Sequence, residues 1–350
     1  MLPYRKISPV YTVNSAVVTR MYALSEVGRS MKTVAHRRRT ILVATDFSKP
    51  ATLVIPYALK LALVLNLRLV ILHVVKPPPG FEQWSPGARR SLHSLKTKAL
   101  LELGRIVRLA NENGLMADHR LLVGIPEDSI LEVAHNPDVA LVAMGTHGKT
   151  GWNRLRLGSV AESTLRQAPC PVLTVRASTA AHIPVNPYRL NVSRLLVATD
   201  FSASSKAALR AAVVLAKRLN ARMVLIHAAE PSNSFQSEPL RIDERSRRRY
   251  AGRLQKMISA SRADKIITDK VVITGNPVEV ILDQAKHRKT DLLIVGTHGR
   301  RGMKRLMLGS IAEAVVRRAA CPVFIVKARA RKPFAMITGT RRSLPRSSTG

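Results

Sequence analysis

The amino-acid sequence predicts an α/β protein made of two tandem, doubly wound parallel sheets of five strands each, with flanking helices. Short, wholly apolar segments alternate with longer segments of helical period, as in parallel sheets whose strands are covered on both faces. The pattern then occurs a second time, since LLVATDFS at 195–202 repeats ILVATDFS at 41–48. The chain of 350 residues is long enough for two such domains.

The strands and helices of the first unit follow from local signals in chain order. Residues 41–45 are apolar and end at Asp46, and Pro50 then favours the first turn of a helix that runs to about Asn66. The next elements are expected at 67–75 (strand), 88–113 (helix), 120–123 (strand), 127–135 (helix), 139–144 (strand), from Gly158 (helix) and at 171–175 (strand). Each strand–helix–strand crossover is expected to be right-handed.

The spacing of the repeated motifs divides the chain into domains. Asp200 lies 154 residues after Asp46, whereas Cys321 lies 151 residues after Cys170, so the second unit is three residues shorter between its second and third strands. Aperiodic residues with two prolines separate the units. We therefore expect a basic N-terminal extension at 1–39, a first domain at 40–176, a linker at 177–192, a second domain at 193–327 and a basic tail at 328–350.

The chain carries a formal net charge of +35, from 57 basic and 22 acidic residues. Such a charge attracts polyanions of every kind without selecting one. Residues 1–39 hold eight Lys or Arg against one acid, and residues 327–350 hold seven and no acid. These compositions predict disordered ends. The first 39 residues loosely resemble a transit peptide, which leaves open whether the mature protein contains them.

The sequence favours a reduced, cytoplasmic protein. No apolar stretch is long enough to cross a bilayer. Cys170 and Cys321 each precede Pro-Val and an apolar strand, which suits small buried residues, and a zinc site would need more ligands nearby. His73 and His227 lie within apolar strands, so we expect them to be hydrogen-bonded residues of the core.

A glycine-rich turn with the spacing Gly-x2-Gly-x9-Gly-Ser follows the fourth strand of each unit. Its residues are Gly145, Gly148, Gly158 and Ser159 in the first unit and Gly296, Gly299, Gly309 and Ser310 in the second. Glycines let a ligand approach the main chain closely, and the free N–H groups of a helix start attract an anion. The turn therefore predicts a phosphate site in each unit. The alternative is a tight strand-to-helix turn in which the two serines are N-caps.

Two acidic residues are expected at the same edge of the sheets as the glycine turns. Asp46 and Asp200 end the first strands of their units, and ligands of doubly wound sheets bind outside the carboxyl ends of the strands. A carboxylate at this edge can accept hydrogen bonds from ribose hydroxyls. The alternative role of each aspartate is a helix N-cap or an Asx-turn.

These motifs occur together in one known family. ATDFS after the first strand, a His-containing second strand, GTHG, Gly-x9-Gly-Ser and Cys-Pro-Val before the last strand are each present twice. The chain thus resembles tandem-domain members of the universal stress protein family over about 40–176 and 193–327. The resemblance implies an adenine nucleotide alpha hydrolase-like fold with the strand order 3-2-1-4-5. It also implies pairing of the domains through their last strands within one chain, and leaves a further homodimer open.

The resemblance implies a ligand as well, because both units have the complete glycine signature of the ATP-binding branch. Asp46 and Asp200 would hold the ribose or the adenine end, and the main chain of Val74 and Ala228 would meet the adenine edge. The residues of the glycine turns would wrap the ribose and the phosphates of ATP, which Mg²⁺ accompanies. The flanking residues expected at the two sites are Ala44, Thr45, Met144, Val160, Ala198, Thr199, Val295 and Ile311.

Other signatures are incomplete. GKT at 148–150 lacks the upstream glycine of a Walker A loop, since Ala143 stands in its place. His147 and His298 have no paired nucleophile or carboxylate motif and are expected to form hydrogen bonds within the turns. The cations between the glycines would either be solvated or contact phosphate: Lys149, Arg154, Arg156, Arg300, Arg301, Lys304 and Arg305.

Three functions remain open. The first is a stress-response regulator that binds ATP in both domains and is not a metabolic enzyme. The second is a slow ATPase or phosphotransferase, which the lack of a clear general base or paired metal-binding carboxylates disfavours, so no catalytic or metal-ligating residue is assigned. The third is a nucleic-acid-associated stress protein that uses its basic surface, although it lacks aromatic stacking motifs and a recognisable reading helix. No membrane partner is expected.

Overall fold

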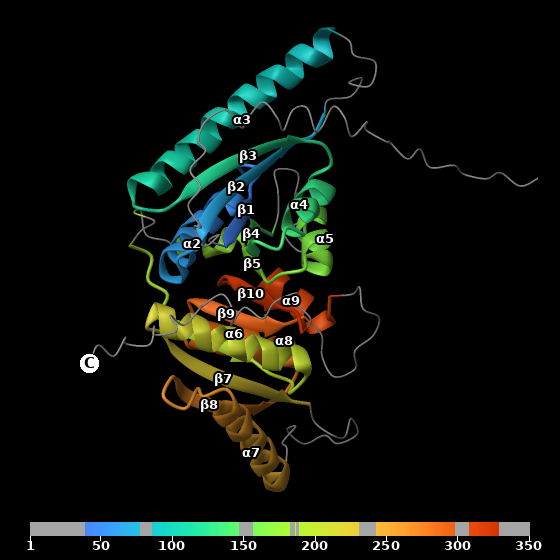
Figure 1. Ribbon diagram of the computed structural model, residues 1–350. Helices are drawn as coiled ribbons and strands as arrows, with labels where there is room; N and C mark the ends of the chain where they lie inside the picture. The colour runs from blue at the N-terminus through green and yellow to red at the C-terminus, as the bar shows by residue number, and fades with distance from the viewer. Residues whose placement is uncertain are drawn as a thin grey trace, which may run out of the picture. The chain divides into compact units, whose positions relative to one another are not determined.

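The computed structural model of the protein describes residues 39–77, 86–146, 157–182, 186, 189–230, 243–297 and 308–328. Both sequence repeats fall within one compact unit. Together they form a single ten-stranded sheet with the order β3-β2-β1-β4-β5-β10-β9-β6-β7-β8 (Figure 1). Each half has the predicted order 3-2-1-4-5, and the two predicted five-stranded parallel sheets are joined edge to edge.

The first repeat alternates strands and helices, and its strands are all parallel. Its elements are β1 (Thr40–Ala44), α2 (Lys49–Leu65), β2 (Arg68–Val75), α3 (Pro86–Glu112), β3 (Ala117–Val123), α4 (Pro126–Ala134), β4 (Val139–Gly145), α5 (Ser159–Gln167) and β5 (Val172–Val175). The largest difference from the prediction is that β3 begins at Ala117 rather than Arg120. Because β3 is an edge strand, its residues are exposed or half-buried and give a weak apolar signal.

The second repeat has the same order of elements. These are β6 (Arg194–Ala198), α6 (Ala203–Leu219), β7 (Arg222–Ala229), α7 (Glu244–Ala260), β8 (Ile267–Thr274), α8 (Pro277–His287), β9 (Leu292–Gly296), α9 (Ser310–Arg318) and β10 (Val323–Val326). A 3₁₀ helix (Ala177–His182) occupies part of the stretch predicted as an aperiodic linker. No helix of the described segments combines the length and the apolar character that a membrane span needs.

Helices cover both faces of the sheet in two continuous apolar layers. On one face, Val43 and Val197 pack among residues of α2, α3, α6 and α7. On the other face, Leu42 and Leu196 pack among residues of α4, α5, α8 and α9. Neighbouring residues of one strand point to opposite faces, so the wholly apolar strands of the sequence supply both layers. Each layer crosses from one repeat to the other without a break.

The two cysteines are buried free thiols, as the sequence predicted. Both belong to the apolar layer beside α5 and α9. Burial raises the pKa of Cys170 and of Cys321 to about 12. Because the thiolate is the reactive form, both side chains are inert packing residues at neutral pH.

The repeats meet where β5 and β10 pair in antiparallel fashion, in the middle of the sheet. Phe324 of β10 lies opposite Leu173 of β5, and both side chains are fully buried. Pairing of the repeats through their last strands within one chain therefore agrees with the expectation. We call this β5–β10 contact the seam.

A cation from each repeat crosses the seam to the end of a helix in the other repeat. The Nη1 atom of Arg176 donates to the carbonyl oxygen of Ala319, after α9, at 3.5 Å. The Nζ atom of Lys327 donates to the carbonyl oxygens of Arg166 and Ala168, at the end of α5, at 2.7 Å each. Arg176 and Lys327 hold equivalent positions in the two repeats. Cations at helix C-termini satisfy unpaired carbonyls and oppose the helix dipole.

Lys327 is expected to make the stability of the protein depend on pH in the alkaline range. Burial lowers the pKa of Lys327 from 10.5 to about 8. Between these pH values the folded chain has released the proton that the unfolded chain still holds. The contribution of this group to the free energy of unfolding therefore rises from pH 8 to pH 10.5, and it is lost as the pH falls through 8.

This expectation is checked by urea denaturation of the native protein and of Lys327→Met at a series of pH values across the window. The stability difference between the two proteins should change through the window, while Lys256→Met, which alters an exposed lysine of α7, should run parallel to the native protein. A constant difference between the native protein and Lys327→Met would contradict the assignment.

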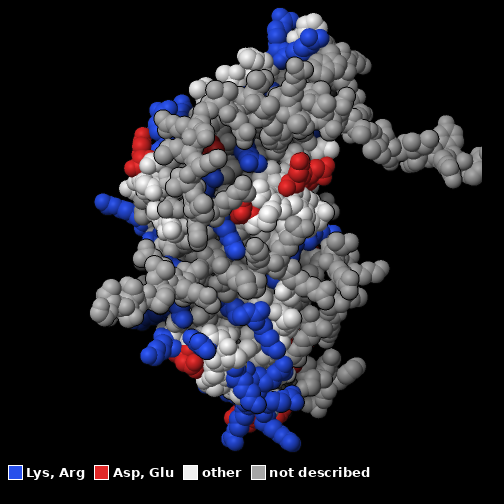
Figure 2. Space-filling model, viewed as in Figure 1, with Lys and Arg blue, Asp and Glu red and all other residues white. Residues whose placement is uncertain are grey.

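The outward face of α7 is strongly basic. Figure 2 shows Lys and Arg side chains gathered where Figure 1 places α7. The opposite face of this helix buries Leu254, Met257 and Ile258. The exposed cations of α7 are Arg245, Arg247, Arg248, Arg249, Arg253 and Lys256. This helix is therefore a concentrated part of the excess positive charge seen in the sequence.

Candidate nucleotide site

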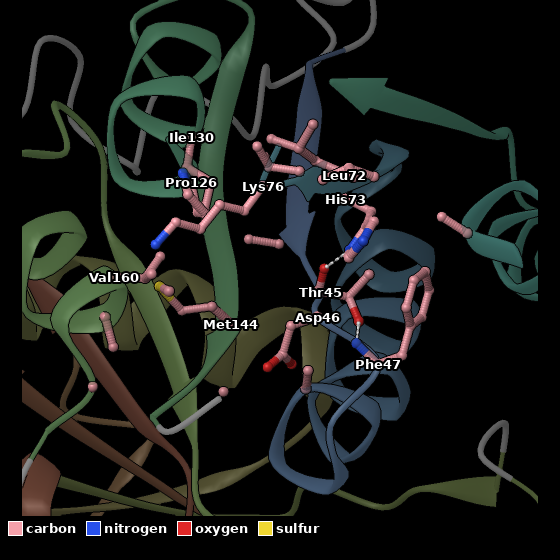
Figure 3. Close-up of a pocket in the computed structure, with 18 of the residues that line it drawn as sticks. Thr45, Asp46, Phe47, Leu72, His73, Lys76, Pro126, Ile130, Met144 and Val160 are labelled. Carbon is pink, nitrogen blue, oxygen red and sulfur yellow. Dashed lines mark hydrogen bonds between the residues drawn. The ribbon is translucent and has the colours of Figure 1, made fainter. Parts of the chain in front are cut away.

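A cavity of about 570 Å³ lies at the carboxyl ends of β1, β2 and β4 in the first repeat (Figure 3). Residues of α3 line one side of it, and the first residues of α4 and α5 line another. The strand order reverses between β1 and β4, which is where doubly wound sheets bind their ligands. The volume falls within the range of small-molecule sites.

Nine of the ten residues predicted for the first site line this cavity. They are Ala44, Thr45, Asp46, Val74, Met144, Gly145, Gly158, Ser159 and Val160. The tenth, Gly148, lies outside the described residues, as do His147 and the cations of both glycine turns. The structure thus brings the described members of the predicted set together, and their role as ligand contacts stays a prediction.

Local hydrogen bonds fix the turn that carries Asp46. The hydroxyl of Thr45 accepts from the backbone N–H of Phe47 at 3.0 Å. The Oδ1 atom of Asp46 accepts from the N–H of Ser48 at 3.0 Å, which is the Asx-turn considered from the sequence. Figure 3 shows the Asp46 carboxylate at the cavity. A carboxylate has about four acceptor positions, and the bond to Ser48 uses one of them.

His73 differs from the expectation for a core residue. Its Nδ1 atom lies 2.7 Å from the carbonyl oxygen of Thr45, so the expected hydrogen bond exists. However, the ring is only half-buried and lines the cavity. The core location predicted for His73 is wrong because one side of the residue faces the cavity rather than packed side chains. His227 of the second repeat is buried, with 6% of its surface exposed.

Gly145 is needed because β4 ends in direct contact with the start of α2. A Cβ atom at this position would lie 2.8 Å from the backbone nitrogen of Ala51. It would also lie 2.9 Å from the backbone carbonyl carbon of Pro50, and both separations are closer than real side chains allow. A glycine here therefore lets the end of β4, the helix start and the cavity lie together.

Gly158 and the first residues of α5 line the cavity, and the N–H of Gly158 donates to the carbonyl oxygen of Thr146 at 3.0 Å. The N-cap of α5 is Gly158, and that of α9 is Gly309, both in extended conformation. The alternative in which Ser159 and Ser310 are N-caps is therefore wrong, because each serine is the first helical residue. The hydroxyl of Ser159 instead donates to Glu127 Oε1 at 2.8 Å. Backbone N–H groups at a helix start favour an anion.

Several lining residues were not found from the sequence. Lys76 directly follows β2, and its side chain extends into the cavity (Figure 3). The rule that ligands bind beyond the strand ends could have indicated it. Leu95, Lys98 and Glu102 of α3 also line the cavity. No local motif marks them, because their position depends on how α3 packs on the sheet.

The second repeat builds the same edge. The Nδ1 atom of His227 lies 2.8 Å from the carbonyl oxygen of Thr199, and Asp200 Oδ1 accepts from the N–H of Ser202 at 3.0 Å. Gly299 and His298 lie outside the described residues. The predicted residues at the ends of β6, β7 and β9 and at the start of α9 are Ala198, Thr199, Asp200, Ala228, Val295, Gly296, Gly309, Ser310 and Ile311.

The fold and the cavity define a tandem, doubly wound α/β protein with a ligand cavity at the switch point of its first repeat. A sequence model described as the universal stress protein family matches residues 37–176 and 191–327. The chain therefore belongs to the universal stress protein family.

Individual relatives cover most of the chain or one repeat. Universal stress protein Rv2005c of Mycobacterium tuberculosis is 26% identical over 287 residues, which is 75% of this chain and 88% of that protein. Universal stress protein MJ0531 of Methanocaldococcus jannaschii is 31% identical over 139 residues, 39% of this chain and 82% of that protein. The crystal structure of a universal stress protein from Archaeoglobus fulgidus has the same fold, with a TM-score of 0.63, 22% identity and coverage of 83% of this chain and 98% of that one.

Proposed function

We propose that the protein binds ATP or a related adenine nucleotide, with Mg²⁺, in each repeat and acts in the stress response as a nucleotide-dependent regulator. The observation that carries the proposal is the meeting of Asp46, Gly145 and the start of α5 in one cavity. A cytoplasmic location and the absence of a metabolic activity are parts of the same proposal. Slow hydrolysis of the bound nucleotide is the enzymatic alternative.

The chemistry of the cavity suits the parts of such a ligand. The N–H groups at the start of α5 would donate hydrogen bonds to the phosphates, and Lys76 would add a positive charge. Asp46 would accept hydrogen bonds from the ribose hydroxyls. Leu72, Ile130 and Met144 would provide an apolar surface for the base.

Asp46→Asn is expected to weaken ATP binding at the first site by roughly tenfold or more, because a charge-assisted hydrogen bond to the ribose is lost. The amide keeps one acceptor for the N–H of Ser48, so the turn should remain. Isothermal titration of Mg-ATP into both proteins measures the change. Asp118→Asn, which alters an exposed carboxylate of β3, is the control and should bind as the native protein does.

The same preparation tests the proposal as a whole. Nucleotide released from the denatured native protein is identified by chromatography, and recovery of ADP alone would favour slow hydrolysis. Equal affinity in Asp46→Asn and Asp118→Asn would contradict the assignment of Asp46. A native protein that neither contains nor takes up an adenine nucleotide would overturn the proposed function.

The basic face of α7 supports a second candidate, binding of nucleic acid. Its cations are exposed while the helix buries Leu254, Met257 and Ile258, so the exposed surface of α7 is positively charged and attracts a phosphate backbone. Arginine suits phosphate because of its planar fork of donors. Salt-sensitive binding of a DNA or RNA duplex, by a protein that takes up no adenine nucleotide, would favour this candidate over the first.

A further inference from the structure

The two candidate sites differ on the side that faces α3 and α7. In the first repeat the cavity reaches α3 beside Phe47 and His73, where Ala99 lines it. Ala99 is a small side chain that packs in a cluster with Phe47 and Val75. We call the part of the cavity next to Phe47, His73 and Ala99 the side branch.

In the second repeat an aromatic ring stands at the corresponding place. Tyr250 of α7 lies 151 residues after Ala99, the same offset that relates the fully buried Leu103 and Leu254. Its ring centroid lies 4.6 Å from that of His227, and it stacks on Phe201 at 6.2 Å with an interplanar angle of 8°.

Phe201 and His227 correspond to Phe47 and His73 of the first repeat, each at an offset of 154 residues. Tyr250 therefore contacts Phe201 and His227, the counterparts of the two rings that line the side branch in the first repeat. Arg253 lies on α7, as Tyr250 does, and its guanidinium lies 3.9 Å from the centroid of the Phe201 ring. This cluster of three rings and a cation stabilises the tyrosine in place.

The charge at the strand end differs as well. Lys76 follows β2 and extends into the cavity (Figure 3). The residue at the same position after β7 is Glu230, 154 residues further along the chain. A carboxylate at the mouth of a site disfavours a polyphosphate, whereas an ammonium group favours it. The ring of Tyr250 and the charge of Glu230 thus both disfavour a nucleotide in the second repeat.

We infer that the two sites are not equivalent: the first repeat carries the tight nucleotide site, and Tyr250 with Glu230 weakens the second. This inference rests on the proposed function, because it assumes that the ligand is an adenine nucleotide. It assigns to Tyr250 and Glu230 the role of setting the difference in affinity between the repeats, while the glycine turn is common to both.

Titration calorimetry with Mg-ATP on the full chain tests the inference. The native protein should show one tight site and a second that is at least about tenfold weaker, and Asp46→Asn should remove the tight phase. Tyr250→Ala should tighten the weak site about tenfold, and Glu230→Lys should shift it in the same direction. Tyr250→Phe, which keeps the ring, should leave both phases unchanged.

Two further variants separate an effect on binding from a failure to fold. Glu230 is exposed at the end of its strand, so Glu230→Lys tests the second site even if Tyr250→Ala fails to fold. Ala99→Tyr places a ring in the side branch of the first repeat and should weaken the tight site. Two equal sites in the native protein, unchanged in Tyr250→Ala and Glu230→Lys, would overturn the inference and leave the proposed function standing. No heat of binding in any variant would instead refute the proposed function.

Discussion

Replacement of Phe324 by alanine is expected to lower the free energy of unfolding by about 3–5 kcal/mol, the usual cost of removing a buried aromatic ring. Phe324 is the largest of the side chains that are fully buried in the protein's described segments. It lies opposite Leu173 across the seam and belongs to the apolar layer that both repeats share. The cavity left by the alanine would therefore be at the junction of the two halves, where neighbouring strands have little freedom to close it.

Equilibrium denaturation in guanidinium chloride measures this loss as a lower midpoint of unfolding. Leu101→Ala is the control, because Leu101 lies on α3 with 63% of its surface exposed. This substitution should change the free energy of unfolding by no more than about 0.5 kcal/mol. A Phe324→Ala variant as stable as the Leu101→Ala variant would show that the seam contributes little to the stability of the fold.

Gly296→Ala is expected to destabilise the protein by about 1–3 kcal/mol, because overpacking forces the backbone apart. A Cβ at this position would lie 2.7 Å from the backbone carbon of Ser204 and 2.7 Å from the backbone nitrogen of Ser205. Neither atom can move without displacing the first turn of α6. Gly145→Ala should have a similar effect, since its Cβ would meet the start of α2 in the same way.

Gly104→Ala supplies the opposite case. This glycine lies within α3, and a Cβ there has no heavy atom within 4 Å. Alanine is the better helix former, so the variant should gain about 0.5–1 kcal/mol. Thermal unfolding of the three variants compares these effects directly. The packing argument would be contradicted if Gly296→Ala and Gly104→Ala changed the melting temperature in the same direction.

The repeated motifs made most of the fold predictable. The offsets of 154 and 151 residues aligned the two units, and wholly apolar strands such as β1 indicated a sheet covered on both faces. The position of Asp46 and Gly145 at one sheet edge followed from strand direction alone, and the cavity lies at that edge. Residues that end strands or begin helices are thus within reach of sequence reasoning.

The residues that were missed are those fixed by packing between distant elements. Glu102 and Ala99 reach the cavity because α3 lies across β2, and neither has a motif. Tyr250 has the period of a buried helix residue, and its contact with His227 depends on the tertiary fold. The sequence left Ser159 open as an N-cap in the alternative reading of the turn, because serine is a common capping residue, whereas the extended conformation falls on Gly158.

The seam has a consequence for assembly. In a protein with one repeat, the last strand would leave an open sheet edge, and pairing of two such edges would depend on protein concentration. Here both partners belong to the same chain, so the linker sets a high effective concentration and dilution does not separate them. The outer edges of the sheet are β3 and β8, which carry the charged residues Asp118, Arg120, Asp269 and Lys270. Charged edge strands resist pairing with further chains, so the sheet is completed within the molecule and protected at its margins.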